Sequence, residues 1–243
     1  MKDERIDSAV AFSILQWDTN FFGVTCAKAI LNKQLTRTEW NYLKDSFSEY
    51  QFISIENRNS EPVNAQLIGT DTTAFLADVN IQFRKKLGNV CDMPEMVQIY
   101  QNMDRDERIL KLGKFTFSKF TEDPDLAKRG GAEVYRQWLI NSFNRPDKFY
   151  AVAVGPDDEI NGFLLHSYSE RTCTVELIAV SGTTSNRGIG TSMFKTVEFA
   201  AYKRGCEEVR VGTQVRNIQA INFYHKCGCD QVECHQVYHL WNL

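Results

Sequence analysis

The sequence has little proline, no long hydrophobic run and almost no net charge. Five prolines in 243 residues, without a low-complexity tract or an internal repeat, exclude a proline-rich linker and a solenoid protein. No run of about 18 apolar residues is present, so no membrane-spanning helix is expected. The opening residues Met1 to Arg5 are charged and no apolar segment follows them, so no signal peptide is expected. These absences predict a cytoplasmic protein without a membrane partner.

Nucleic-acid and metal sites are also not expected. The net charge is −3, whereas nucleic-acid-binding domains usually carry a basic patch or stripe. The seven cysteines have no spacing typical of a disulfide framework, and we expect reduced thiols. Histidine and cysteine crowd the carboxyl end at His225, Cys227, Cys229, Cys234, His235 and His239. Their spacing lacks the paired Cys-x-x-Cys or histidine ligands of a typical zinc site, so we predict no metal.

The composition that remains is that of a globular α/β protein. Hydrophobic residues make up 43% and charged residues 24% of the chain, and the length suffices for two domains with cores of their own. We predict a smaller amino-terminal α/β domain over residues 1–90 and a mixed central sheet flanked by helices over residues 95–243. The boundary is placed in the polar segment 84–95, which contains Gly88 and Pro94.

Local patterns predict several elements. Residues 36–39 have capping-box spacing and predict the start of a helix. Residues 10–31 are expected to form strands broken at the turn-rich triplet 18–20. Residues 75–83 alternate between apolar and polar side chains, which predicts a strand with one face exposed to water. The segment 115–129 is polar, aromatic and poor in helix signals. The amino-terminal part contains no phosphate-binding loop, so we expect it to shape a wall of the substrate cleft.

The most informative stretch is 185–191, with the sequence Ser-Asn-Arg-Gly-Ile-Gly-Thr. It follows a predicted strand that ends at residues 176–180 and precedes an apolar-periodic helix. A strand that turns through glycines into a helix exposes several backbone N–H groups, which attract an anion such as phosphate. Gly188 and Gly190 let the backbone approach such a ligand. A short Gly-x-Gly turn is also found at helix starts that bind nothing, so its context decides.

That context is similar to the Gcn5-related N-acetyltransferases. Their signature, Gln/Arg-x-x-Gly-x-Gly/Ala at a helix start followed after a strand by Asn-x-x-Ala-x-x-x-Tyr, resembles residues 185–190 and 217–224. The chain departs from it at Ser185, where the family usually has Gln or Arg, and Arg187 could replace that pyrophosphate contact. The resemblance implies acetyl-CoA as co-substrate, bound by Ile178, Ala179, Val180, Asn186, Arg187, Gly188, Ile189, Gly190, Thr191 and Asn217.

The same resemblance assigns catalytic roles. Tyr224 is implied as the general acid that protonates the departing thiolate, and residues seven apart on a helix share a face, which places Tyr224 with Asn217. A core aromatic is the alternative interpretation of Tyr224. Glu176 is a candidate base because a carboxylate on this strand serves some family members, although a solvated strand-face glutamate is the competing interpretation. The amine could also lose its proton to water.

Further matches resemble the acetyltransferases that act on TDP-fucosamine in bacterial surface-polysaccharide synthesis. They lie at residues 17–24, 118–120, 135–139 and 211–217, and in the aromatic tail 238–241. This resemblance implies a TDP-4-amino-4,6-dideoxyhexose as acceptor, with candidate substrate residues Phe21, Phe22, Ser118, Lys119 and Phe120. Core packing or a solvated connector is the alternative for each. Acetylation of a protein amino terminus, an amino acid or an antibiotic, and a non-catalytic acyl-CoA-binding module, also stay open, as does a homodimer formed through a carboxyl-terminal edge strand.

Overall fold

The computed structural model describes residues 9–88, 96–156, 158–182 and 188–242. Its strands are β1 (Val10–Ile14), β2 (Cys26–Leu31), β3 (Phe52–Asn57), β4 (Phe75–Lys86), β5 (Val97–Gln101), β6 (Phe149–Val154), β7 (Ile160–Ser169), β8 (Thr172–Val180), β9 (Glu208–Gln214) and β10 (Asp230–Trp241). Its helices are α2 (Gln16–Phe22), α3 (Arg37–Phe47), α4 (Pro62–Asp71), α5 (Glu107–Leu112), α6 (Lys119–Glu122), α7 (Pro124–Lys128), α8 (Val134–Ser142), α9 (Ile189–Lys203) and α10 (Ile218–Lys226). Two short 3-10 helices are η1 (Arg58–Ser60) and η2 (Gly131–Glu133).

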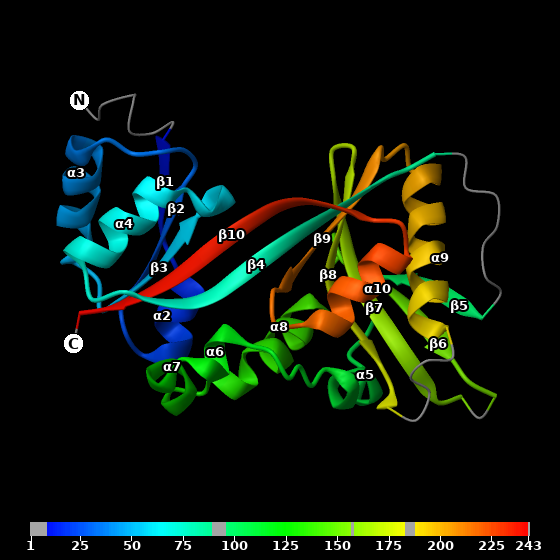
Figure 1. Cartoon of the computed structure of the whole chain (residues 1–243). Helices are drawn as coiled ribbons and strands as arrows, with labels where there is room; N and C mark the ends of the chain where they lie inside the picture. The colour runs from blue at the N-terminus through cyan, green and yellow to red at the C-terminus, as the bar shows by residue number, and fades with distance from the viewer. Residues whose placement is uncertain (1–8, 89–95, 157, 183–187, 243) are drawn as a thin grey trace.

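The strands form one mixed sheet across the described residues. Its order is β1-β2-β3-β10-β4-β9-β8-β7-β6-β5, with parallel pairs only at β2–β3 and β8–β9 among the described strands. The long strands β4 and β10 run side by side through the middle of the molecule (Figure 1). They join the amino-terminal strands and helices α3 and α4 at one end to the larger part that contains α9 and α10 at the other (Figure 1).

This topology bears on the predicted domains. Strand β10 pairs with β3 through Gln236–Trp241 and with β4 along most of its length, so the carboxyl-terminal strand completes the sheet of the amino-terminal part. The carboxyl-terminal strand is therefore central, and the expectation that it forms an edge is wrong. Strands β1 and β5 are the edges. The division into residues 1–90 and 95–243 stays a prediction, because hydrogen bonding in the sheet continues across it.

Local signals explain most of the amino-terminal elements. Helix α3 begins at a complete capping box, in which the Thr36 hydroxyl accepts from the Glu39 amide and the Glu39 carboxylate accepts from Thr36. Its apolar face is buried, as the spacing of residues 40, 43 and 47 dictates. Strand β4 confirms the predicted strand over 75–83 and extends three residues further.

Two local predictions are wrong. The triplet 18–20 lies inside helix α2. The chain turns only at Gly23, which ends the helix in a left-handed conformation at φ 68°, and the burial of Phe22 holds the helix against the core. The segment 115–129 contains α6 and α7, whose N-cap residues are Ser118 and Asp123 respectively. Each of these two side chains accepts backbone N–H groups from the first turn of its helix, and α7 carries Pro124 at its first position.

The core of the larger part lies between the sheet and helix α9. The apolar stripe predicted for this helix is buried, with Met193, Val197 and Ala201 fully enclosed against β5–β9. Helix α10 packs beside it through Tyr224. None of the helices in the described ranges is long and apolar enough to span a membrane.

Candidate active site

The site begins where two parallel strands separate. Strands β8 and β9 pair from Thr172 to Val175 on β8, and the pairing then stops although both strands continue. Strand β8 stays paired with β7, and its register shifts between Leu165 and His166, which leaves Glu176 as the extra residue of a bulge. A bulge bends its strand, so β8 diverges from β9 at this residue. The backbone of 176–180 therefore has no β9 partner within the described chain and can hydrogen-bond a ligand.

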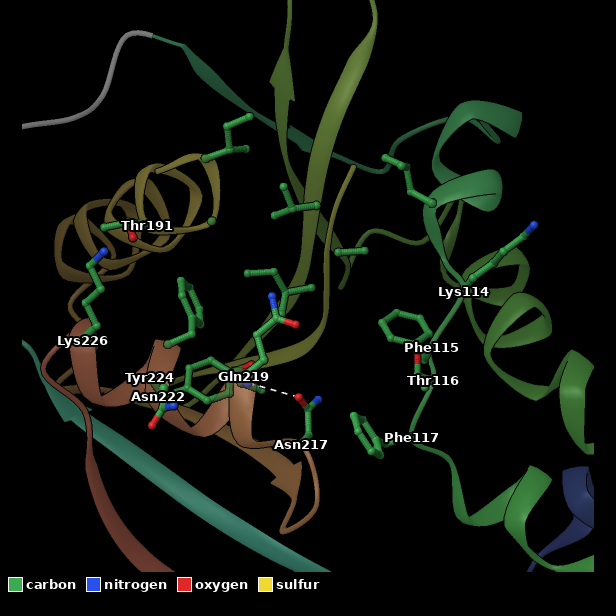
Figure 2. Close-up of a pocket in the computed structure, with 18 of the residues that line it drawn as sticks. Lys114, Phe115, Thr116, Phe117, Thr191, Asn217, Gln219, Asn222, Tyr224 and Lys226 are labelled. Carbon is green, nitrogen blue, oxygen red and sulfur yellow. Dashed lines mark hydrogen bonds between the residues drawn. The ribbon is translucent and has the colours of Figure 1, made fainter. Parts of the chain in front are cut away.

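A cavity of about 660 Å³ lies at this opening. Its walls come from the end of β8, the start of α9, helix α10 and the segment 114–117 before α6. Figure 2 shows Phe115, Thr116 and Phe117 on one side of this cavity and the α10 residues on the other. Of the predicted acetyl-CoA residues, the structure brings together Ile178, Ala179, Val180, Gly188, Ile189, Gly190, Thr191 and Asn217. We call this cavity of about 660 Å³ the donor cavity. Asn186 and Arg187 lie outside the described residues.

The start of α9 is suited to an anion. Gly188 is the N-cap at φ 80°, a conformation that favours glycine, and no side chain caps the helix among the described residues. No described side chain thus accepts from the first N–H groups of the helix, and the helix dipole favours a negative charge there. A Cβ at Gly190 would lie 3.2 Å from the Phe223 ring, so glycine also allows α9 and α10 to pack closely. These features fit the pyrophosphate and pantetheine parts of acetyl-CoA.

Helix α10 holds the two predicted side chains. The Asn217 Oδ1 accepts from the Ala220 backbone N–H at 3.1 Å, so this residue caps the helix while lining the donor cavity. Tyr224 is 3% exposed and its ring packs against Phe83, Phe194 and Phe223. Burial raises the pKa of the Tyr224 hydroxyl, which therefore keeps its proton at neutral pH. No hydrogen bond joins that hydroxyl to another side chain in the described ranges, so its proton is available to a ligand.

A second cavity of about 590 Å³ adjoins the first, and we call it the acceptor cleft. Its floor is formed by β4, β9 and β10, and its roof by the segment 115–120 and helix α8. Seven residues line both cavities: Phe115, Thr116, Phe117, Ile178, Asn217, Ala220 and Tyr224. Tyr224 therefore stands where two ligands, one in each cavity, would meet.

The predicted acceptor residues divide into two groups. Lys119 and Phe120 line the acceptor cleft. Ser118 lines neither of the two cavities, and its hydroxyl caps α6 by accepting from the Phe120 backbone N–H at 3.2 Å. Phe21 and Phe22 also line neither cavity. Phe22 is 3% exposed in a core cluster against which Phe21 packs, so core packing describes both phenylalanines.

Glu176 lines the acceptor cleft, and both of its carboxylate oxygens already have protein partners. Its Oε1 accepts from the Ser167 hydroxyl at 2.6 Å and pairs with the Lys148 ammonium, and its Oε2 accepts from the Trp138 indole at 3.3 Å. These three donors hold the carboxylate at the bulge. A base must give up such contacts or share them when it takes a proton, so the role of Glu176 as base stays a prediction that this geometry does not favour.

The polar floor of the acceptor cleft is the part that sequence reasoning missed. It consists of Asp78, Asn80 and Gln82 on β4, Arg210 and Gln214 on β9, and Glu233 and His235 on β10. The alternation of apolar and polar residues in β4 predicted one face exposed to water, and that face forms the floor of the acceptor cleft. The signal that it lines a site, rather than facing bulk water, lies in the pairing with β9 and β10, which the sequence does not show.

The cysteines and histidines of the carboxyl end do not gather into a metal site. Residues 227, 229 and 234 carry free thiols, and His239 Nδ1 donates to Asp123 Oδ2 at 2.7 Å. No group of three potential metal ligands occurs among residues that the structure describes. The absence of a metal stays a prediction.

Comparison with known proteins identifies the fold. The sequence model of the acetyltransferase (GNAT) family matches residues 112–229, which contain both walls of the donor cavity. A GCN5-related N-acetyltransferase from Sphaerobacter thermophilus superposes with a TM-score of 0.62 at 12% identity, over 96% of this chain and 76% of that one. The protein has the GNAT acetyltransferase fold. The predicted α/β architecture with a mixed sheet flanked by helices is confirmed. GNAT enzymes use acetyl-CoA as the acetyl donor, and the donor cavity offers the groups to bind it.

Other proteins are similar to this chain in fold or in sequence. A tandem GNAT protein from the clavulanic acid biosynthesis pathway superposes with a TM-score of 0.57 at 11% identity, over 90% of this chain and 78% of that one. The spore coat polysaccharide biosynthesis protein SpsD of Bacillus subtilis (strain 168) is 26% identical over 137 residues, or 56% of this chain and 47% of SpsD. The uncharacterized protein YdhI of the same strain is 29% identical over 112 residues, or 46% of this chain and 62% of YdhI. The chain thus spans about half to two thirds of these two relatives.

Proposed function

We propose that the protein transfers the acetyl group of acetyl-CoA to the amino group of a nucleotide-linked deoxyamino sugar, a TDP-4-amino-4,6-dideoxyhexose, for surface-polysaccharide synthesis. The observation that carries this proposal is the meeting of the donor cavity and the acceptor cleft at Tyr224 and Ile178. A direct transfer needs two ligands in contact, and adjoining cavities with shared walls provide that arrangement.

The residues of the donor side have separate tasks. The unpaired backbone of 178–180 would align the pantetheine arm and donate N–H groups to the carbonyl oxygen as it gains negative charge. Donors of this kind contribute about 3 kcal/mol each to transition-state stabilisation. Tyr224 would donate its hydroxyl proton to the departing sulfur. A free thiol has a pKa of about 8.5, so its thiolate is a fair leaving group and needs only modest assistance from a general acid.

The acceptor side supports a polar, hydroxyl-bearing substrate. The floor presents the amides of Asn80, Gln82 and Gln214, and the roof presents the aromatic rings of Phe117, Phe120, Tyr135 and Trp138. Hydrogen-bonding groups opposite apolar ring faces suit a sugar ring. The resemblance to a spore coat polysaccharide biosynthesis protein points toward saccharide chemistry as well. A cytoplasmic location and the absence of nucleic-acid partners belong to the same proposal.

The test is thiol release from acetyl-CoA with a panel of TDP-linked 4-amino and 3-amino sugars, followed by the mass of the product. A single acetyl group gained by one sugar is the expected result. The panel includes amino acids, a peptide amino terminus and an aminoglycoside, because acetylation of one of these alone would contradict the sugar assignment. If acetyl-CoA protects the protein against heat and no amine is acetylated, the protein is an acyl-CoA-binding module instead.

A further inference from the structure

The acceptor cleft contains four carboxylates that differ in their partners: Glu56, Asp78, Glu176 and Glu233. Three of them have a cationic side chain within 4.0 Å, namely Lys28 at 2.7 Å from Glu56, Lys148 beside Glu176 and Arg210 at 3.9 Å from Glu233. Among the described residues, Asp78 alone of the four has no Lys, Arg or His nitrogen within that distance. An acceptor ammonium group that enters the cleft therefore finds one carboxylate whose charge is not already paired.

A bulge in strand β4 directs Asp78 into the cleft. In the pairing with β10, Asp78 lies opposite Val237 and Leu76 lies opposite Tyr238, so Ala77 is the extra residue. Beyond the bulge the strand is regular, and Asp78, Asn80 and Gln82 share the face that forms the cleft floor. Bulges often re-aim a side chain next to an active site.

The strand pairing also brings Asp78 close to the donor side. The Val215 backbone N–H donates to the Val79 carbonyl at 2.7 Å, where β9 ends. Asn217, which lines both cavities and begins helix α10, follows two residues later. Asp78 thus sits on the cleft floor beside the loop that leads to the helix of Tyr224.

We propose that Asp78 is the acceptor-side catalytic residue, which binds the ammonium group of the incoming amine and takes one proton from it. This inference rests on the proposed function. The carboxylate oxygen forms an O–H bond with the proton as the N–H bond breaks, and the nitrogen keeps the electron pair. That pair forms the new C–N bond to the acetyl carbon, while the C–S bond breaks and the sulfur takes the Tyr224 proton. The second nitrogen proton returns to the Tyr224 oxygen, and Asp78 releases its proton to water.

The surroundings of Asp78 make its carboxylate more basic than that of an exposed aspartate. Burial raises the pKa of its carboxyl group, while the charge of Lys119 on α6 acts in the opposite direction. Glu122 on α6 and Arg216 after β9 also face it, with opposite effects on the pKa, and the Tyr135 hydroxyl on α8 senses its charge. A carboxylate whose pKa is raised without being neutralised is a stronger proton acceptor than an exposed aspartate.

The decisive comparison is Asp78→Asn against Asp78→Glu and the control Glu122→Gln. Glu122 lies on the roof helix and pairs with Arg216 at 2.9 Å, but it does not line the acceptor cleft. We expect Asp78→Asn to lower kcat/KM for the amine by about 10²-fold at pH 7. The loss should shrink as the pH rises toward the pKa of the amine, because the amine then arrives uncharged. Asp78→Glu should recover part of the activity, and Glu122→Gln should stay within about threefold of the wild type.

Two further measurements distinguish a failure of the role of Asp78 from a failure of the proposed function. The dissociation constant for acetyl-CoA and the thermal unfolding midpoint of Asp78→Asn should match those of the wild type, since the substitution preserves shape. If Asp78→Asn folds, binds acetyl-CoA and keeps its kcat/KM within about threefold, or if its loss is equal at every pH, the role of Asp78 is wrong while the proposed function stands. If the wild type acetylates no amine, the proposed function itself fails and this inference falls with it.

Discussion

The donor cavity and the acceptor cleft share one wall but are built differently. The donor cavity is lined by residues 178–180 of β8, by the glycine-containing start of α9 at 188–191, by helix α10 at 217–226 and by the segment 112–117. The acceptor cleft is lined by charged and amide side chains from strands β3, β4, β8, β9 and β10 and from the roof segments. Backbone groups cannot change with sequence, whereas side chains can. In the proposed function, the backbone at 178–180 and at the start of α9 binds one fixed donor, and the side chains of the cleft select the acceptor.

This difference makes the two cavities separable by mutation. A change at their shared wall should affect the transfer step itself, whereas changes on one side should alter the KM of one substrate only. The expected effects below run from the largest to the smallest.

Tyr224→Phe tests the shared wall. Removal of the hydroxyl deletes the proton donor and leaves the ring packed against Phe83 and Phe223, so kcat should fall about 10²-fold. The affinity for acetyl-CoA, measured by calorimetry, should change by less than about twofold. Tyr42→Phe, on the exposed face of α3, is the matched control. A Tyr224→Phe enzyme with full turnover would remove the tyrosine from the chemistry.

Asn217→Ala tests the donor side. Loss of the cap to the Ala220 N–H should lower the free energy of unfolding by about 1 kcal/mol. Loss of the side-chain amide should raise the KM for acetyl-CoA about tenfold, and the acceptor KM should change less. Asn217→Ser keeps an oxygen for the cap but has no amide, so it should recover stability without recovering the KM. Recovery of both would mean that Asn217 acts only through the helix.

Gly212→Ala tests the acceptor side. A Cβ at Gly212 would lie 2.5 Å from Gln82 Nε2 and 3.0 Å from Asn80 Oδ1, so these two amides must move. The acceptor KM should rise about fivefold, which corresponds to one weakened hydrogen bond, while the KM for acetyl-CoA stays constant. Gly69→Ala in helix α4, where a Cβ meets no atom within 4 Å, is the control. A larger effect on acetyl-CoA than on the acceptor would contradict the separation of the two cavities.

Glu176→Gln should have the smallest effect on turnover. Its carboxylate is already bound by Lys148, Ser167 and Trp138, so kcat/KM should stay within about threefold of the wild type. Thermal or urea unfolding should show a cost of about 1–3 kcal/mol, because Lys148 loses its buried anion. A loss of turnover near 10²-fold with an intact fold would make Glu176 the base and would displace Asp78 from that role.

The contrast also explains what the sequence could predict. The donor cavity depends on local signals, so the glycine turn, Asn217 and Tyr224 could be placed from their spacing and their resemblance to a family. The acceptor cleft depends on β10, whose pairing with β3 and β4 joins residues between 146 and 189 positions apart. The resemblance to sugar acetyltransferases placed Phe21 and Phe22 in this cleft, whereas α2 carries them into the core. The sequence placed Asp78 only on the water-exposed face of a strand, because the neighbours of that face depend on the register of β4 with the strands beside it.

The most direct test of the account is a crystal structure of the protein with acetyl-CoA. The account predicts the pantetheine arm beside Ile178–Val180, the pyrophosphate at the start of α9, and the thioester sulfur within hydrogen-bonding reach, about 3.5 Å, of the Tyr224 hydroxyl. The acetyl group should then face the acceptor cleft on the side of Asp78. A thioester that points away from Tyr224, or acetyl-CoA bound in the acceptor cleft, would contradict the assignment of the two cavities.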